Sequence, residues 1–453
     1  MPAGRSGARP VALSTDDNPA RRPLLNLLLF AASVLLWAAA FPNRIFEWGL
    51  WPLGWIALAP AVLALRRSTM LETVIISPLF GWLTYALFNY WLGTFHPLAM
   101  TVVALIYAGY YLVLFPLLKL AERLFPRNGF LVQIAIWLAY EYLRTLGYLG
   151  YPYGIIGYSQ YLFLPLVRLS SITGVWGVSA LVVAPSFFLG WMLDRTPQQF
   201  HAFLQRHRLA IGGWVVLLAA ALVWGVATRV DYTESRHVRM ALVQQNVDPW
   251  QGGSRAYRRS LDALMRQSDA ALAEDPGIEM VVWSETSFVP AIDYHRQFRA
   301  NRDNWEIVRE LLSYMEAQDV PFVIGNDDGQ RAQLDDGSFD RVEYNAVLLF
   351  EDGDIAERYW KTHLVPFTEH FPYENLLPGV PQLLLDFDTH FWEAGTEYTV
   401  FESLGFRFSS PICFEDSFGY LNRRFVNNGA EVLINLTNDS WANSETAMVQ
   451  HAA

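Results

Sequence analysis

The chain has 453 residues and a formal net charge of −11, and 53% of its residues are hydrophobic while only 17% are charged. Soluble domains average about 25% charged residues, so this composition argues against an ordinary soluble protein, and the length predicts at least two domains. The negative charge and the lack of a basic stripe argue against nucleic-acid binding. A single cysteine, Cys413, excludes an internal disulfide.

Nearly all long apolar runs lie between residues 24 and 228. A membrane-spanning helix needs about 20 apolar residues, and about seven stretches approach this length. These are Leu24–Phe41, Leu50–Leu65, Val74–Leu92, Met100–Leu120, Phe130–Leu146, Leu166–Leu193 and Leu209–Thr228. Buried helices of a large soluble protein are the alternative, but seven stretches with short connectors favour a membrane bundle over residues 24–228. The sixth stretch is long enough for a tilted helix or for a span plus an interfacial turn.

Cationic residues predict the orientation of this bundle, because they concentrate in cytoplasmic loops. The polar, Arg-bearing residues 1–23 are predicted to be a disordered cytoplasmic tail. Further cations follow the second, fourth and sixth spans, and the alternate loops hold few of them. They are Arg66, Arg67, Lys119, Arg123, Arg127, Arg195, Arg206 and Arg208. Seven spans from a cytoplasmic N-terminus place residues 232–453 on the periplasmic side of a bacterial inner membrane.

Residues 232–453 have the composition of a soluble domain, and strand patterns alternate in them with helix patterns. The predicted strands cover residues 238–247, 278–283, 320–325, 344–350, 355–360, 398–402, 406–413 and 431–436. The predicted helices cover residues 254–274, 305–317 and 420–428. Strands that alternate with helices and are covered on both faces predict a layered α/β sandwich.

Three reactive side chains, Glu285, Lys361 and Cys413, each follow a strand-like stretch in this domain. A thiolate is a strong nucleophile, a carboxylate can accept the thiol proton, and an ammonium can stabilise a tetrahedral oxyanion. A helix that begins just after Cys413 would point backbone N–H groups at the same place. Taken singly, the three residues also fit a helix cap, a surface charge and a packed thiol. The ordered set predicts attack on an ester or amide carbonyl through a thioester.

The order Glu, Lys, Cys is that of nitrilase-type amide and acyl-transfer enzymes. From about residue 24 to its end, the chain resembles the apolipoprotein N-acyltransferases of bacterial inner membranes. The resemblance rests on residues 283–286, 361–369, 412–415 and 438–441, and in the membrane half on residues 151–154, 157–160 and 174–179. It implies a multi-pass α-helical membrane bundle fused to a nitrilase-like αββα sandwich on the periplasmic side.

The resemblance also implies a role for each matched residue. Glu285 matches the general base, Lys361 the residue that stabilises the oxyanion, and Cys413 the carrier of the acyl group. The residues that match the family's active-site support are Glu369, Phe414, Glu415 and Asn345, with Trp250 as an offset candidate for a tryptophan in the loop after the first strand.

The reaction that the resemblance implies is ping-pong. An acyl chain leaves a phospholipid, typically phosphatidylethanolamine, and forms a thioester on Cys413. The α-amino group of a diacylglyceryl-cysteine apolipoprotein then takes the chain, which completes lipoprotein maturation. No metal and no diffusible cofactor are implied. Because both substrates are anchored in the membrane, a membrane bundle is a physically sensible base for the catalytic domain.

Four features depart from the family pattern. Phe414 stands where the family usually has Tyr, Thr368 stands where it usually has Gly, and Trp250 is only an offset match. The chain also stops at Ala453, where family members continue with more strands and a last membrane span. The sequence therefore predicts a catalytic domain over 232–453 that is truncated at its C-terminus.

Two other functions fit parts of the pattern. A membrane-anchored nitrilase-type amidase or hydrolase would use the same three residues with water as the acyl acceptor. A non-catalytic membrane scaffold or a transporter is the second alternative. A transporter should carry ionisable residues or broken helices at mid-membrane, and the predicted spans show few.

Overall fold

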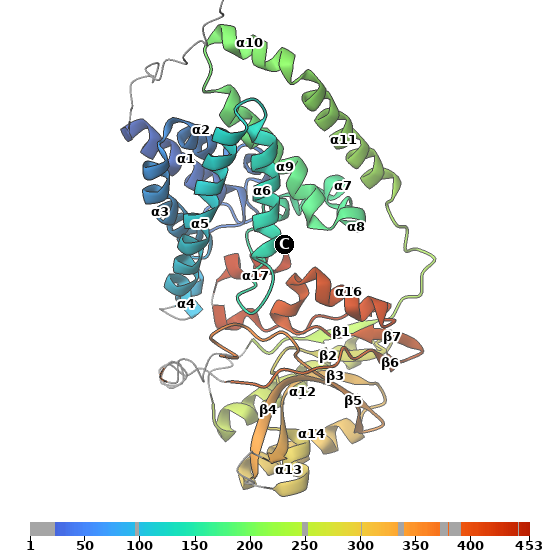
Figure 1. Cartoon of the computed structure of the whole chain (residues 1–453). Coiled ribbons are helices and arrows are strands. Elements are labelled where there is room, and N and C mark those ends of the chain that lie inside the picture. The colour runs from blue at the N-terminus through green and yellow to red at the C-terminus, as the bar shows by residue number, and fades with distance from the viewer. Residues whose placement is uncertain are drawn as a thin grey trace, which may run out of the picture.

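The computed structural model describes residues 23–95, 99–246, 252–299, 301–333, 339–371, 379, 391–442 and 444–453. Residues 1–22 of the predicted tail and the predicted site residue Trp250 lie outside these ranges. The chain forms two stacked parts, a helical bundle and an α/β domain, which meet at helix α17 (Glu445–Ala452) (Figure 1).

Five helices of the bundle are long and apolar enough to cross a membrane. They are α1 (Pro23–Ala40), α3 (Met70–Phe88), α5 (Ala99–Leu124), α9 (Val175–Met192) and α11 (Arg208–Ala227). All five overlap predicted spans. The predicted fifth span is the shorter apolar helix α6 (Gly129–Leu143). Short elements connect them, namely α4 (Leu92–Phe95), η2 (Ile156–Gln160), α7 (Leu164–Val167), α8 (Ser170–Thr173) and α10 (Pro197–Arg206). Residues 166–174 of the sixth predicted span precede α9 and lie in α7, α8 and the turns beside them.

The second predicted span differs from a single helix. Residues 50–65 contain the 3-10 turn η1 (Trp51–Trp55) and most of the nine-residue helix α2 (Ala59–Arg67). Pro52 and Pro60 each lie in the first turn of these elements, a position where the missing backbone N–H of proline costs no hydrogen bond. Helix α2 packs inside the bundle against α1 and α9.

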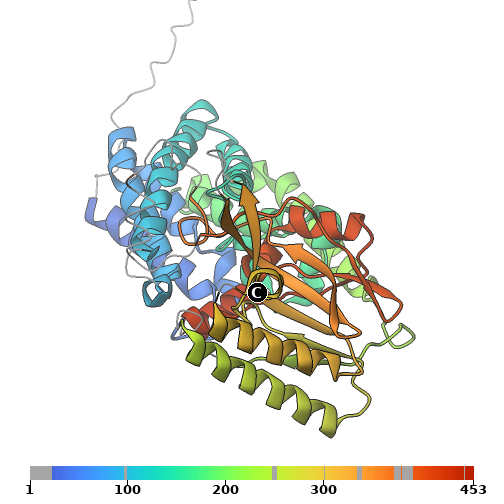
Figure 2. The ribbon, with the colours of Figure 1, turned by 90° about the horizontal axis from the view of Figure 1, so that it is seen from below.

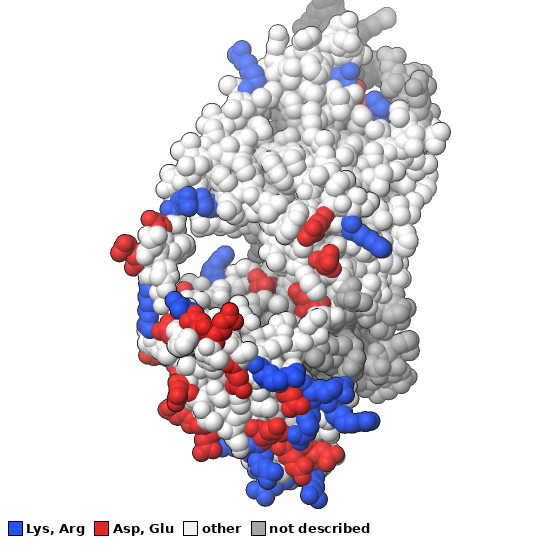
Figure 3. Space-filling view, turned by 180° about the vertical axis from the view of Figure 1, so that it is seen from behind, with Lys and Arg blue, Asp and Glu red and all other residues white. Residues whose placement is uncertain are grey.

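The helical bundle and the α/β domain differ in the charge of their surfaces. Charged side chains crowd the lower, α/β part, whereas the bundle above is almost bare of charge except near its upper end (Figure 3). Large apolar side chains are exposed on the bundle, for example Leu209, Val216 and Val223 on α11, which are 82%, 66% and 68% exposed. A wide uncharged band of this kind is the surface that a lipid bilayer covers.

The α/β domain contains a five-stranded sheet in the order β1-β2-β3-β4-β5. Strands β1 (Met240–Val243), β2 (Met280–Trp283) and β3 (Phe322–Gln333) are parallel, and β4 (Phe339–Glu351) and β5 (Asp354–Trp360) continue antiparallel. A second sheet has the order β6-β7-β8, with β6 (Phe401–Ser403), β7 (Phe406–Ser409) and β8 (Val432–Leu433).

Successive side chains of a strand point to opposite faces of the sheet, so the large sheet contributes to two hydrophobic cores. Val282 packs toward the second sheet and helix α16 (Gly419–Asn427), while Val281 packs toward α12 (Ser254–Glu274) and α14 (Arg302–Glu316). From below, α12 and α14 lie side by side across the sheet (Figure 2), and the short α13 (Ile292–Phe298) follows β2. The predicted αββα sandwich and membrane bundle are confirmed.

Helix α17 joins the α/β domain to the bundle, and the amide of Gln450 makes most of its hydrogen bonds to the bundle. Gln450 Nε2 donates to the carbonyl oxygens of Pro42 at 2.7 Å and Phe88 at 3.2 Å. Its Oε1 accepts from Trp91 Nε1 at 2.9 Å. Tyr90 adds a hydroxyl contact with Thr446 at 2.7 Å. These buried hydrogen bonds fix where α17 lies against the membrane half.

Candidate active site

Three chain segments bring the predicted residues together. Glu285 follows β2, Lys361 directly follows β5, and Cys413 begins the 3-10 turn η3 (Cys413–Ser417) after β7. All three side chains are buried. Gly325 of β3 lets the Glu285 loop approach, because a Cβ on Gly325 would lie only 2.4 Å from the carbonyl oxygen of Ser284.

The Lys361 ammonium lies between two carboxylates. Its Nζ is 2.8 Å from Glu369 Oε1 and 3.4 Å from Glu285 Oε1. Asn345 Nδ2 donates to the same Glu285 oxygen at 2.9 Å, and the backbone N–H of Asn438 approaches the other oxygen at 3.3 Å. Glu369 is itself held by the backbone N–H of Val365 at 2.9 Å. The carboxylates are therefore fixed by neutral donors as well as by the lysine.

These contacts set the charge states around the thiol. Burial opposes the charged form of Lys361, but the carboxylates of Glu369 and Glu285 outweigh it, so its pKa is raised. Burial and the charge of Glu285 raise the pKa of the Cys413 thiol, while Lys361 lowers it. The resting site thus holds a lysine cation beside a protonated thiol, whose ionisation requires a nearby base.

Cys413 has a left-handed backbone conformation, with a φ of 51°. Such values are uncommon for residues other than glycine and cluster at functional sites. Its N–H donates to the carbonyl oxygen of Leu436 at 2.9 Å, which fixes the turn to the neighbouring strand segment. The element that begins at Cys413 is a five-residue 3-10 turn, and the helix α16 predicted nearby starts only at Gly419.

Glu415 ties the lysine loop to the cysteine loop. Its carboxylate accepts the Tyr359 hydroxyl at 2.8 Å and the backbone N–H groups of Thr362 and His363 at 2.9 and 3.0 Å. The N–H of Ile412 donates to it at 2.8 Å. Burial raises the pKa of Glu415, and these donors offset part of that effect. Through these hydrogen bonds Glu415 holds the lysine loop and the cysteine loop together.

Phe414 connects the site to the membrane half. Its ring stacks on Tyr153 with centroids 5.9 Å apart and an interplanar angle of 5°. Tyr153 lies in the loop between α6 and η2, and its ring also approaches His451, at 6.3 Å between centroids. An aromatic wall from the bundle therefore covers the residue next to the thiol.

A second link from the same loop reaches the turn that carries Glu369. The Tyr148 hydroxyl donates to the carbonyl oxygen of His370 at 2.6 Å and accepts the N–H of Phe367 at 2.9 Å. Phe367 has a positive φ of 65°, so the turn is a conformation that needs support. The membrane half thus holds the turn whose carboxylate binds Lys361.

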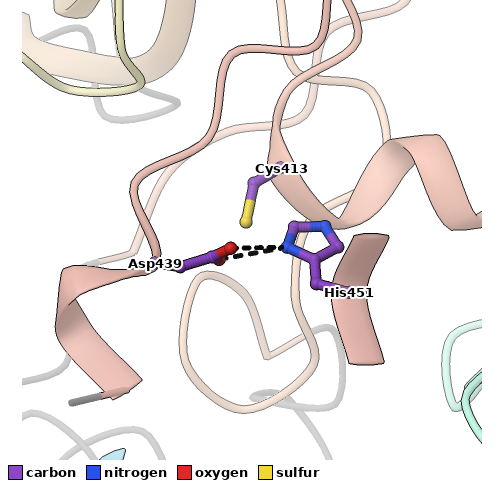
Figure 4. Close-up of side chains that lie close together, drawn as sticks. All are labelled: Cys413, Asp439 and His451. Carbon is purple, nitrogen blue, oxygen red and sulfur yellow. Dashed lines mark hydrogen bonds and ion pairs between the residues drawn. The ribbon is translucent and has the colours of Figure 1, made fainter. Parts of the chain in front are cut away.

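Sequence reasoning missed Asp439 and His451 as site residues. The Cys413 sulfur, a carboxylate oxygen of Asp439 and a ring nitrogen of His451 lie within 4.8 Å of one another (Figure 4). His451 Nδ1 is 3.0 Å from Asp439 Oδ1, and its Nε2 is 3.3 Å from Asp416 Oδ1. Asp439 belongs to a motif that the sequence singled out, but only the fold places α17 beside it.

Two protein-family models match this chain, and together they define its class. A family model described as carbon-nitrogen hydrolase matches residues 239–453, and one described as the apolipoprotein N-acyltransferase N-terminal domain matches residues 32–188. The chain is thus a multi-pass membrane protein with a carbon-nitrogen hydrolase domain.

Proteins similar in sequence show the family to which the chain belongs. The chain is 42% identical to apolipoprotein N-acyltransferase 1 of Treponema denticola, over 94% of this chain and 81% of the relative. It is 41% identical to apolipoprotein N-acyltransferase 1 of Treponema pallidum, over 95% and 81%. The chain belongs to the apolipoprotein N-acyltransferase family. Among solved structures, an amidase from Nesterenkonia aligns at 16% identity with a TM-score of 0.30, over 44% of this chain and 65% of the amidase.

Proposed function

We propose that this protein transfers an acyl chain from a phospholipid to the N-terminal amine of a diacylglyceryl apolipoprotein, through a thioester on Cys413. The observation that carries the proposal is the burial of a lone thiol beside a Lys361–Glu285 pair, in a domain docked on a lipid-facing bundle. Family membership supports the substrates, which are a phosphatidylethanolamine-like donor and an apolipoprotein acceptor.

In the first half-reaction, Glu285 takes the thiol proton and the Cys413 sulfur attacks the ester carbonyl of the donor. The tetrahedral oxyanion forms beside the Lys361 ammonium, which stabilises it. Collapse breaks the ester C–O bond, and Glu285 returns the proton to the departing lysophospholipid oxygen. The products are the lysophospholipid and an acyl-cysteine thioester, so atoms and charge balance.

In the second half-reaction, the neutral α-amine of the acceptor attacks the thioester carbonyl. Lys361 again faces the oxyanion, and Glu285 takes a proton from the amine as the amide forms. The C–S bond breaks and the thiolate regains that proton. Each half-reaction therefore uses the same three side chains, which is the logic of a ping-pong enzyme. No step calls for a metal or a cofactor, so we expect the activity to survive treatment with chelators.

We also propose the domain limits and orientation read from the sequence. They are a cytoplasmic tail at 1–23, a membrane part at 24–228 and a periplasmic catalytic domain at 232–453, in the bacterial inner membrane. The cations Arg66, Arg67 and Lys119 near one end of the bundle support this orientation. Alkaline phosphatase fused after residue 235 should be active, and a fusion after residue 68 should be inactive. The reverse pattern would refute the orientation.

A transfer assay tests the proposed reaction. The purified chain is incubated with phosphatidylethanolamine vesicles and a synthetic diacylated lipopeptide, beside a Cys413→Ala control. The expected product is a lipopeptide heavier by one acyl chain, formed only by the unaltered protein. Release of free fatty acid without acylated peptide would support the hydrolase instead, and no turnover of either kind would support the scaffold.

A further inference from the structure

The aspartate Asp439, which lies beside the thiol, carries a charge that opposes catalysis. A carboxylate next to Cys413 raises the pKa of the thiol, because it repels the thiolate. Glu285 does the same but also takes the proton, so its charge is lost when the thiolate forms. Asp439 has no such role in the two half-reactions. Its negative charge therefore needs another partner.

His451 is that partner. Its Nδ1 lies 3.0 and 3.2 Å from the two carboxylate oxygens of Asp439, and its side chain is 7% exposed. On the other side of the ring, Nε2 lies 3.3 Å from Asp416. Hydrogen bonds and ion pairs with these two aspartates outweigh burial, and the pKa of His451 is raised to about 10. The imidazole is therefore charged at neutral pH.

The geometry places this cation where it can act on the sulfur. In Figure 4 the sulfur of Cys413 points toward the Asp439–His451 pair. The sulfur, an Asp439 carboxylate oxygen and a His451 ring nitrogen lie within 4.8 Å of one another. The other charged or titratable groups that face the thiol are Glu285, Lys361 and Tyr153. Among the described residues, Lys361 and His451 are thus the two cations near the nucleophile.

The position of His451 depends on the membrane half. The preceding residue, Gln450, is held by the carbonyl oxygens of Pro42 and Phe88. His451 also lines a cavity of about 250 Å³ between the two parts of the protein, together with Phe41, Phe88, Tyr153 and Asp416. The imidazole thus lines this cavity and lies near the thiol, on a helix that the bundle anchors.

We propose that His451 is a positioning residue for the reaction, whose imidazolium neutralises Asp439 and so limits the opposition of that carboxylate to ionisation of the Cys413 thiol. The inference rests on the proposed function only in making Cys413 the nucleophile.

Alkylation of the thiol tests this without any acyl transfer. Because Cys413 is the only cysteine, the rate of iodoacetamide labelling across pH 6 to 10.5 reports its ionisation directly. The detergent-solubilised variants are H451Q, D439N and the double variant D439N/H451Q. The control is H295Q, which alters another buried histidine, on α13.

We expect H451Q to move the labelling profile to higher pH and to slow labelling at pH 7.5 by about tenfold, one unit of pKa. The double variant should recover most of the loss, because it also removes the charge of Asp439. H295Q should match the unaltered protein. Two results would overturn the inference: H451Q with an unchanged profile and an unchanged melting temperature, or a double variant as slow as H451Q. A failed acyl-transfer assay would leave this readout intact, so the two proposals fail separately.

Discussion

The ammonium of Lys361 lies 2.8 Å from Glu369 but 3.4 Å from Glu285, the residue proposed as the base. In the proposed mechanism, the closer carboxylate holds the lysine in place, and the more distant one exchanges a proton with the thiol. Because the two glutamates have different proposed roles, a substitution at each one tests a different step.

Glu369→Gln should lower kcat by about 10- to 100-fold, because the neutral amide holds the Lys361 ammonium less firmly where the oxyanion forms. KM for the phospholipid should change little. Steady-state transfer assays measure both values. The matched control is Glu431→Gln, which removes an exposed carboxylate 3.8 Å from Arg407 and should leave kcat within about twofold. Equal effects of the two variants would refute the role of Glu369.

Asn345→Leu removes the neutral donor that fixes Glu285 at 2.9 Å while keeping a side chain of similar size. We expect kcat to fall about tenfold, the size of one lost hydrogen bond to a charged group, with KM unchanged. Transfer kinetics and a melting curve measure the two effects separately. A loss confined to thermal stability would mean that Asn345 supports the fold of β4 and not the base.

Tyr148→Phe tests whether the membrane half supports the site. It deletes both hydrogen bonds to the Phe367–His370 turn and keeps the aromatic contact with Phe367, whose ring centroid lies 5.7 Å away. We expect kcat to fall about tenfold and protease cleavage within this turn to become faster. Tyr161→Phe loses a longer hydroxyl contact to Trp48 and serves as the control. Wild-type kinetics in both variants would contradict the coupling.

The stability of the protein should depend on His451 in one pH window. Its pKa is raised from 6.5 to about 10, so its proton stabilises the folded state fully below pH 6.5, and this contribution is lost as the pH rises through 10. The difference in melting temperature between the unaltered protein and H451Q should therefore be largest at pH 6 and shrink by pH 10.5. A difference that stays constant across this range would contradict a charged imidazole in the folded state.

Elements whose signals are local were predicted well from the sequence. Helix α12 spans Ser254–Glu274, as its apolar period indicates, and five predicted spans match long apolar helices. The span at 50–65 was predicted as one helix because hydropathy reports how apolar a run is and not where helices begin and end within it. Packing of α2 inside the bundle then made a short helix stable.

The site residues, too, fall into those with a local sequence signal and those without one. Glu285, Lys361 and Cys413 stand at strand ends with distinctive neighbours, so their proximity followed from the layout of the sheets. His451 gives no such signal. It lies on a short helix, and only the docking of α17 against the bundle brings it to Asp439 and Cys413. Contacts that depend on the meeting of two domains leave no periodicity in the chain.

The acyl-enzyme on Cys413 is tested most directly by the intact mass of the purified protein after incubation with phosphatidylethanolamine vesicles and no acceptor. We expect a gain of one fatty-acyl mass that hydroxylamine removes, that Cys413→Ala abolishes, and that a diacylated lipopeptide discharges. An adduct that survives in Cys413→Ala would contradict a thioester on this residue. Acyl transfer to the lipopeptide by Cys413→Ala at the unaltered rate would contradict the whole mechanism.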